Sequence, residues 1–140
     1  MNKKKNQLKA EIFYDFKRKE DTIIEADRDR ISQVIHNLLD NALKFTTIHN
    51  QQMIFVIIDK KKEGNEVIVN VKDTGEGISD KILSKLFTKF ATSDPTTGTG
   101  LGLYICKNII EAHGGRIWAK NNSDENGAIF SFTLPIAKVK

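Results

Sequence analysis

Residues 98–115, which read GTGLGLYICKNIIEAHGG, decide the fold. Apolar residues recur there at helical spacing and a glycine pair follows, so we expect a helix over residues 100–113. Five residues are expected to hold this helix on the core: Leu101, Tyr104, Ile105, Ile109 and Ala112. Gly98, Gly100 and Gly102 are unfavourable helix residues, because each glycine costs about 1 kcal/mol inside a helix. Their position instead leaves main-chain N–H groups unobstructed at a helix N-terminus, which favours anions such as phosphate.

A second glycine-rich segment, DTGEGI at residues 73–78, directly follows a predicted strand. Its glycines permit positive φ and the close approach of a flat ligand. Asp73, at the strand end, can accept a hydrogen bond from an amino group such as that of adenine. A calcium loop or a plain turn is the alternative, although the spacing of an EF-hand is absent. Residues 98–103 are not a dinucleotide fingerprint, and the chain contains no P-loop motif.

The helix predicted over residues 27–45 carries polar side chains beside its apolar stripe. At about 100° per residue, six side chains share the core face: Ile31, Val34, Ile35, Leu38, Ala42 and Phe45. Asp29, His36 and Asp40 face water, and Asn37, Asn41 and Lys44 fall together at the border. Amide oxygens suit Mg²⁺ and a lysine suits phosphate, which makes this row a candidate site. An ordinary exposed edge of an amphipathic helix is the alternative.

The rest of the chain predicts short strands around these helices. The predicted strands cover residues 11–16, 22–26, 53–59, 66–72, 116–120 and 128–134, with a short helix over 79–86. Gly64 and Asn65 form a turn that joins the third and fourth strands as an antiparallel hairpin. This order predicts one α/β (α+β) domain over residues 10–137, after a disordered tail at residues 1–9. Its expected form is a mixed or mostly antiparallel sheet with helices on one face.

Composition places few further limits on function. The net charge of +4 is spread over short lysine clusters, which indicate a solvated surface rather than a nucleic-acid patch. Cys106 is the one cysteine, so an internal disulfide is impossible and a reducing compartment is expected. Neither a membrane span nor a signal peptide is predicted, so a cytoplasmic domain is expected, although the parent protein could be membrane-anchored.

In this order, the segments resemble the conserved boxes of sensor histidine kinases. DRISQVIHNLLDNALKFT at residues 29–46 resembles the N box, and VKDTGEGI at 71–78 the first glycine box. KLFTKF at residues 85–90 resembles the phenylalanine box, and residues 98–115 the second glycine box. IFSFTLP at residues 129–135 is also typical of the family. The resemblance spans residues 10–136 and implies a Bergerat ATP-binding fold, a two-layer sandwich of a mixed sheet and three helices.

The resemblance also implies a role for each site residue. Asn41 is expected to hold Mg²⁺, Asn37 to lie near the metal and the phosphates, and Lys44 to contact phosphate. Asn37 and Lys44 are the expected catalytic residues. Asp73 is expected to accept from the adenine amine with help from Thr133. The remaining expected ligand contacts are Phe45 beside the nucleotide, Gly75, Gly77 and Ile78 at the adenine, and Gly98, Thr99, Gly100, Leu101 and Gly102 at the phosphates.

The resemblance implies that residues 87–99 are the mobile lid over ATP, here unusually short. Many relatives place an arginine shortly after the phenylalanine box, where this chain has Ala91, Thr92 and Ser93. Lys89 is the nearest cation, so the lid's contact with the γ-phosphate stays open.

The implied activity is that of a histidine kinase catalytic domain that binds Mg-ATP. Its γ-phosphate is expected to pass to a histidine on a separate helical hairpin, the dimerisation domain of the parent kinase. A response regulator is an indirect partner, and no contact with nucleic acid or membrane is expected. His36, His49 and His113 do not lie in an acceptor motif, so the domain is expected to be inactive alone.

Three alternatives share the fold. An ATP-hydrolysing clamp, as in type II topoisomerases, has glutamate where Asn37 stands, and asparagine cannot act as a base. A nucleotide-binding module without turnover and an anti-sigma-type serine kinase are the others.

Overall fold

The computed structural model describes residues 10–16, 23–45, 52–60, 65–89, 100–123 and 126–137. Its strands are β1 (Ala10–Phe16), β2 (Gln52–Lys60), β3 (Glu66–Asp73), β4 (Ile117–Asn121) and β5 (Ala128–Pro135). Its helices are α1 (Arg28–Phe45), α2 (Asp80–Leu83) and α3 (Gly102–Ala112). The predicted disordered tail at residues 1–9 lies outside this described part. None of the described helices is both long and apolar enough to cross a membrane.

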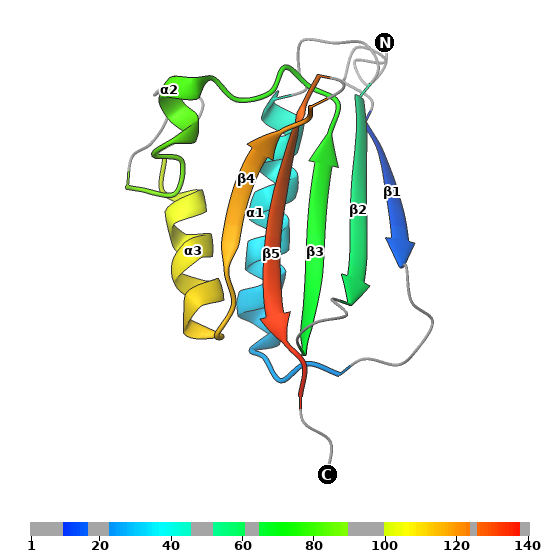
Figure 1. The fold of residues 1–140 in the computed structure, drawn as a ribbon, viewed down its shortest axis with the longest axis vertical. Coiled ribbons are helices and arrows are strands. Elements are labelled where there is room, and N and C mark those ends of the chain that lie inside the picture. The colour runs from blue at the N-terminus through cyan, green and yellow to red at the C-terminus, as the bar shows by residue number, and fades with distance from the viewer. Residues whose placement is uncertain are drawn as a thin grey trace, which may run out of the picture.

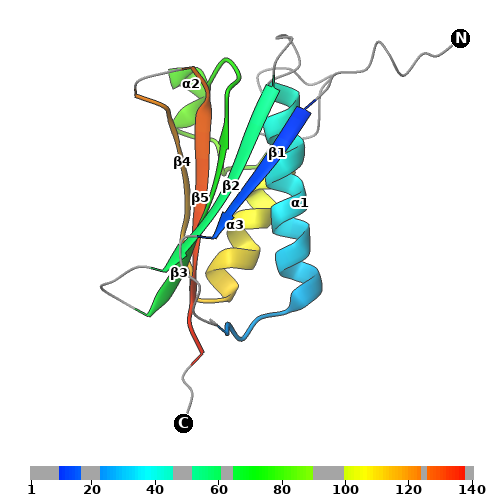
Figure 2. The same ribbon diagram turned by 90° about the vertical axis from the view of Figure 1, so that its right-hand side faces the viewer.

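The strands form one mixed sheet in the order β1-β2-β3-β5-β4 (Figure 1). β1 pairs with β2 in parallel, and the other neighbours are antiparallel. The parallel pair is possible because α1 lies in the connection between β1 and β2, as a crossover requires. Figure 2 shows the sheet edge-on, with α1 and α3 together on one face. The predicted two-layer α/β sandwich with a mixed, mostly antiparallel sheet is confirmed.

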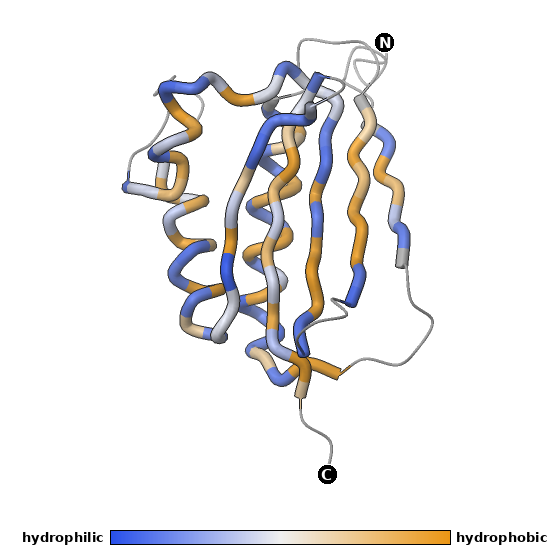
Figure 3. The backbone as a smooth tube through the Cα atoms, in the orientation of Figure 1, coloured by the Kyte–Doolittle hydropathy of each residue, from blue (hydrophilic) through white to orange (hydrophobic). Residues whose placement is uncertain are grey.

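The strand pattern follows the two faces of the sheet. In β3, burial alternates residue by residue, with Val67, Val69 and Val71 on the helix side. β2 is hydrophobic over most of its length and hydrophilic at its end (Figure 3). A one-residue slip of β3 would turn its valines away from the helices, so this pattern sets the register.

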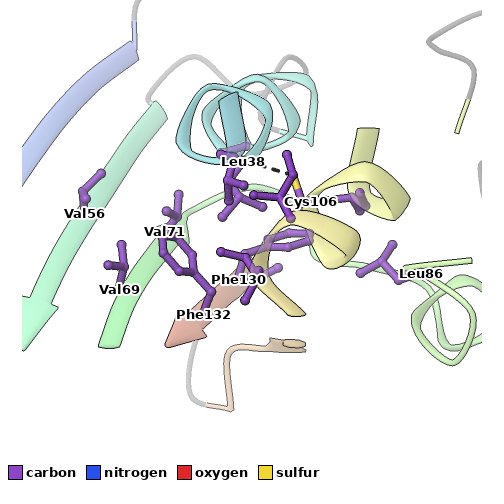
Figure 4. Packing of buried hydrophobic residues seen from close by; sticks show 14 of the residues in the cluster. Leu38, Val56, Val69, Val71, Leu86, Cys106, Phe130 and Phe132 are labelled. Atoms are coloured by element: carbon purple, nitrogen blue, oxygen red, sulfur yellow. Dashed lines mark hydrogen bonds between the residues drawn. The ribbon is translucent and has the colours of Figure 1, made fainter. Parts of the chain in front are cut away.

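The core lies between α1, α3 and the helix side of the sheet. Val34, Leu38 and Ala42 of α1 are fully buried, as their helical spacing predicted. Leu38 and Cys106 face the layer that holds Phe130 and Phe132 of β5 (Figure 4). Burying a side chain of this size contributes roughly 1.5–3 kcal/mol, so this layer holds the two helices on the sheet.

Three local predictions were wrong. In α3 the buried residues are Leu103, Cys106, Ile109 and Ile110, whereas Ala112, predicted to be in the core, is exposed. Residues 23–26 form no strand, because only Ile24 pairs, in a single bridge with Ile136. The predicted helix over residues 79–86 ends as a helix at Leu83 and continues in turns.

Candidate functional site

Three predicted segments converge toward one end of the molecule. The C-terminal end of α1, the C-terminal end of β3 and the N-terminal end of α3 all point that way (Figure 1). On α1, Asn37 and Asn41 are partly buried and Lys44 is exposed, which matches their predicted place at the border of the core face. Phe45 ends the helix, but its side chain lies outside the described part of the chain.

Asn37 joins α1 to α3. Its side-chain nitrogen Nδ2 lies 3.4 Å from the main-chain oxygen of Gly102 and 3.6 Å from Sγ of Cys106. A carbonyl oxygen only accepts hydrogen bonds, so the NH₂ group of Asn37 must be the end that faces α3. The amide oxygen Oδ1 then points away from α3, where it can accept from or coordinate another group.

Cys106 supports this arrangement from the core. Its side chain is fully buried, and Sγ lies 3.9 Å from the main-chain oxygen of Val34 on α1. Burial raises the pKa of the Cys106 thiol to about 11, against a smaller lowering by the hydrogen bond from Asn37. The thiol therefore stays protonated near neutral pH, and its S–H can donate to Val34 while its sulfur accepts from Asn37.

Asp73 is the most unusual polar group of the site. It ends β3, is fully buried, and pairs across the sheet with Ile54 on the helix side. Its oxygen Oδ1 accepts from the N–H of Gly75 at 2.9 Å and that of Ala128 at 3.3 Å. Its other oxygen, Oδ2, is buried without a hydrogen-bond partner among the described residues.

The environment of this carboxylate disfavours its charge. Burial raises the pKa of Asp73, and the hydrogen bonds from Gly75 and Ala128 lower it by less. A buried acceptor without a donor is costly, and a donor that reaches Oδ2 removes that cost. The chemistry of this position therefore suits an incoming amino group.

The first glycine segment wraps closely around Asp73. Gly75 is buried, and Gly77 has a φ of +86°, which a residue with a side chain adopts only with strain. Ile78 is 6% exposed and belongs to the core. The structure thus places Gly75, Gly77 and Ile78 in one loop with the carboxylate; their contact with adenine stays a prediction.

The second glycine segment is described from Gly100 onward. Gly100 has a φ of +76°, Leu101 is the N-cap of α3, and Gly102 is the first helical residue. Gly98 and Thr99, predicted at the phosphates, lie outside the described residues. The contact between Asn37 and Gly102 shows that the first turn of α3 lies beside the polar edge of α1.

Sequence reasoning missed the residues that hold the first glycine loop from outside. Asn121 and Asn122, where β4 ends, bond to the main chain of Ile78 and Asp73. Gly127 lies so close that a Cβ on it would be 2.0 Å from the main-chain oxygen of Asp73. The glycines of residues 73–78 drew attention to the loop, but no signal in the sequence linked it to a turn more than 40 residues away.

Thr133 does not join the site. The register pairs it with Ile68, on the opposite face of the sheet from Asp73 and five residues away along β3. Its hydroxyl oxygen accepts from the main-chain N–H of Arg116 at 3.0 Å. The residue of β5 that contacts Asp73 is Ala128, so the prediction that Thr133 assists Asp73 was wrong.

The cations and histidines singled out in the sequence make other contacts. Lys89 has its Nζ 5.3 Å from the centre of the Tyr104 ring, a cation–π contact with α3. His36 is exposed beside Asp40, and Nε2 of His113 accepts from the N–H of Asp27 at 3.0 Å. His49 and residues 90–99 of the predicted lid lie outside the described part.

A metal ion at this site would need oxygen ligands from water and from the phosphates of the ligand in addition to those of the protein. In the part of the chain that the structure describes, no three His, Cys, Asp or Glu side chains gather as a metal site. Mg²⁺ is commonly held by one or two protein groups, waters and substrate phosphates, so the amide of Asn41 fits that pattern.

Comparison with known proteins gives a consistent result. The profile of the histidine kinase-, DNA gyrase B- and HSP90-like ATPases matches residues 26–138. The chain is 45% identical over 122 residues to the sensor protein KdpD of Clostridium acetobutylicum, covering 83% of this chain and 13% of that protein. It therefore spans only a small part of that relative's length.

Solved structures agree in fold. The nucleotide-free catalytic domain of histidine kinase ThkA is 38% identical with a TM-score of 0.77, covering 90% of this chain and 78% of that one. Full-length ShkA in complex with AMPPNP is 29% identical with a TM-score of 0.77, covering 93% of this chain and 26% of that one.

Proposed function

This chain belongs to the family of histidine kinase-, DNA gyrase B- and HSP90-like ATPases, as the ATP-binding catalytic domain of a sensor histidine kinase, and we propose that it donates the γ-phosphate of Mg-ATP to a histidine on a separate helical hairpin. That hairpin would be the dimerisation domain of the parent kinase. A response regulator would receive the phosphate afterwards, and the domain would work in the cytoplasm.

One observation supports the adenine end of the site above all others. Oδ2 of Asp73 is buried without a partner among the described residues, while Oδ1 is held by two main-chain N–H groups. The adenine amine is a donor of the right kind for Oδ2. Gly75 and Gly77 add no side chains of their own to the loop beside the carboxylate, which suits the close approach of a flat base.

The phosphate end is assigned to α1 and the start of α3. Oδ1 of Asn37 and the amide of Asn41 would face the phosphates, and Lys44 would neutralise their charge. The main-chain N–H groups at the N-terminal end of α3 would bind phosphate oxygens, with Gly100, Leu101 and Gly102 closest. Mg²⁺, held in part by Asn41, would supply charge neutralisation at the transferred group.

These groups bind and position rather than form covalent bonds. Phosphoryl transfer needs an in-line nucleophile, which the acceptor histidine would supply, and stabilised charge, which this edge of α1 would supply. Asn37 stands where hydrolysing relatives have glutamate, so the chain lacks a base there to activate water. Transfer to an acceptor histidine is therefore favoured over hydrolysis.

The test supplies the acceptor in trans. The domain is mixed with the histidine-bearing hairpin of its parent protein and ATP labelled at the γ-position. Acid-labile phosphate on the hairpin is the expected result, and a His→Ala hairpin is the control. ATP binding without transfer would point to a non-turnover module. Acid-stable phosphoserine on another protein would point to the anti-sigma-type kinase. Release of phosphate from ATP when no acceptor is present would point to a hydrolysing clamp.

A further inference from the structure

The side chain of Asn121 pairs with the main chain of a single distant residue, Ile78. Its Oδ1 accepts from the N–H of Ile78 at 2.7 Å, and its Nδ2 donates to the C=O of Ile78 at 2.8 Å. Both distances are those of good hydrogen bonds. The amide thus satisfies both main-chain groups of Ile78, as a neighbouring strand would, although β4 itself ends at Asn121.

Asn122 holds the other end of the same loop. Its Nδ2 donates to the main-chain oxygen of Asp73 at 3.2 Å and to that of Asn126 at 3.0 Å. Its main-chain N–H donates to the oxygen of Gly127 at 2.9 Å, which closes the turn between β4 and β5. Gly127 is pressed against the same oxygen of Asp73, so the turn and the end of β3 are in direct contact.

The loop is also shaped around the Asn121 side chain. A Cβ on Gly77 would lie 2.9 Å from Oδ1 of Asn121, closer than real Cβ contacts allow. Gly77 already has a φ of +86°. The loop conformation and the Asn121 amide therefore depend on each other, and neither asparagine bonds to the carboxylate of Asp73 itself.

We propose that Asn121 and Asn122 are positioning residues that clamp both ends of the 73–78 loop and so fix the direction of the Asp73 carboxylate toward adenine. The inference rests on the proposed function of Asp73. The clamp acts on the adenine end of the ligand, whereas Asn37 and Asn41 act on the phosphate end. Loss of the clamp must therefore lower the binding affinity for every adenine nucleotide by the same factor, with or without Mg²⁺.

Titration calorimetry on Asn121→Ala tests this signature. With the two bonds to Ile78 lost, affinity should fall roughly tenfold for ATP and for ADP alike. The preference for ATP over GTP should fall as well, because a carboxylate whose direction is less fixed distinguishes adenine from guanine less well. Asn126→Ala is the matched control, since it removes an exposed asparagine side chain from the same turn and keeps the main-chain oxygen that Asn122 uses.

Hydrogen exchange separates the clamp from nucleotide binding. The N–H of Ile78 should exchange faster in Asn121→Ala than in the wild type or in Asn126→Ala, without any ligand. If Asn121→Ala does not fold, Asn121→Asp keeps the acceptor for the Ile78 N–H and loses the donor, and the same two measurements apply. Wild-type chain that fails to bind ATP would overturn the proposed function, while the exchange of Ile78 still tests the clamp.

Three results would overturn the clamp. The first is wild-type affinity in Asn121→Ala. The second is a loss that depends on Mg²⁺ or on the number of phosphates. The third is an affinity loss with an unchanged preference for ATP over GTP, because a purely structural role would lower binding without altering base discrimination.

Discussion

The side-chain nitrogen of Asn37 lies 3.4 Å from the main-chain oxygen of Gly102, so the polar edge of α1 is tied to the first turn of α3. The second contact of this nitrogen, Sγ of Cys106 at 3.6 Å, comes from one turn further along α3. The main-chain oxygen of Gly102 fixes which end of the amide faces α3, because a carbonyl oxygen only accepts. The oxygen of Asn37 is thereby oriented before any ligand binds, which lowers the entropy lost on binding.

Cys106→Val should weaken Mg-ATP binding through this contact. Valine is apolar and cannot accept from the Asn37 amide, so the amide loses one of its two hydrogen-bond partners on α3. We expect a loss of roughly threefold in affinity for Mg-ATP, measured by calorimetry, since one weak hydrogen bond is worth about 0.5–1 kcal/mol. Affinity for Mg²⁺-free ADP should change less.

Cys106→Ser is the matched variant, because its hydroxyl still accepts from Asn37 and donates to Val34. Its loss of Mg-ATP affinity should be smaller than that of Cys106→Val. Equal affinities in the two variants would show that Cys106 only fills space.

Asn41→Ala should remove the Mg²⁺ dependence of ATP binding. The variant loses the amide assigned to the metal. Asn41 is only partly buried, so its replacement should leave the packing of the buried residues of α1 intact. Affinity measured with Mg²⁺ and with a chelator should then be nearly the same, whereas the wild type should bind more tightly with Mg²⁺. Asp40→Ala, on the exposed side of the same turn, is the control. An unchanged Mg²⁺ dependence in Asn41→Ala would refute the metal role.

The sequence could predict the core face of α1 but not that of α3. On α1, apolar and polar residues separate into distinct faces, and Val34, Leu38 and Ala42 are buried as expected. The polar side of α3, with Lys107, Asn108 and Glu111, leaves a broad apolar arc, and the spacing alone did not show that the end of the arc with Leu103 and Ile110 is the buried one. Only packing against α1 and the sheet decides which end is buried.

Contacts between distant segments could not be predicted either. The placement of Thr133 depends on the register of β5 against β3, and a strand reverses the face of its side chains at every residue. The pairing of Asn121 with Ile78 depends on how the β4–β5 turn meets a loop 43 residues earlier. The glycine motif identified Asp73, because Gly75 and Gly77 lie beside it in the sequence. The residues that hold its loop are far from it in the sequence, so the motif did not include them.

Asp73→Asn should abolish or greatly weaken ATP binding. An amide at this position keeps an oxygen for the N–H groups of Gly75 and Ala128 and turns its NH₂ toward the place of Oδ2. The NH₂ of the new asparagine then faces the adenine amine, which is also a donor, so we expect the affinity for ATP to fall on the order of a hundredfold. Glu76→Gln, an exposed change in the same loop, is the control. Near-normal affinity in calorimetry would contradict the adenine assignment.

The same variant should be more stable than the wild type when no nucleotide is bound. Burial raises the pKa of Asp73 above its ordinary value of 3.8, so the folded chain binds this proton more tightly than the unfolded chain. The stability that the protonated group contributes is fully present below 3.8 and is lost as pH rises through the raised pKa. Above its raised pKa the folded wild type thus holds a buried charge that Asp73→Asn does not. Thermal unfolding from pH 4 to 8 should show the advantage of the variant growing as pH rises above 3.8. A constant difference across this range would mean that the carboxylate of Asp73 titrates alike in the folded and unfolded chain.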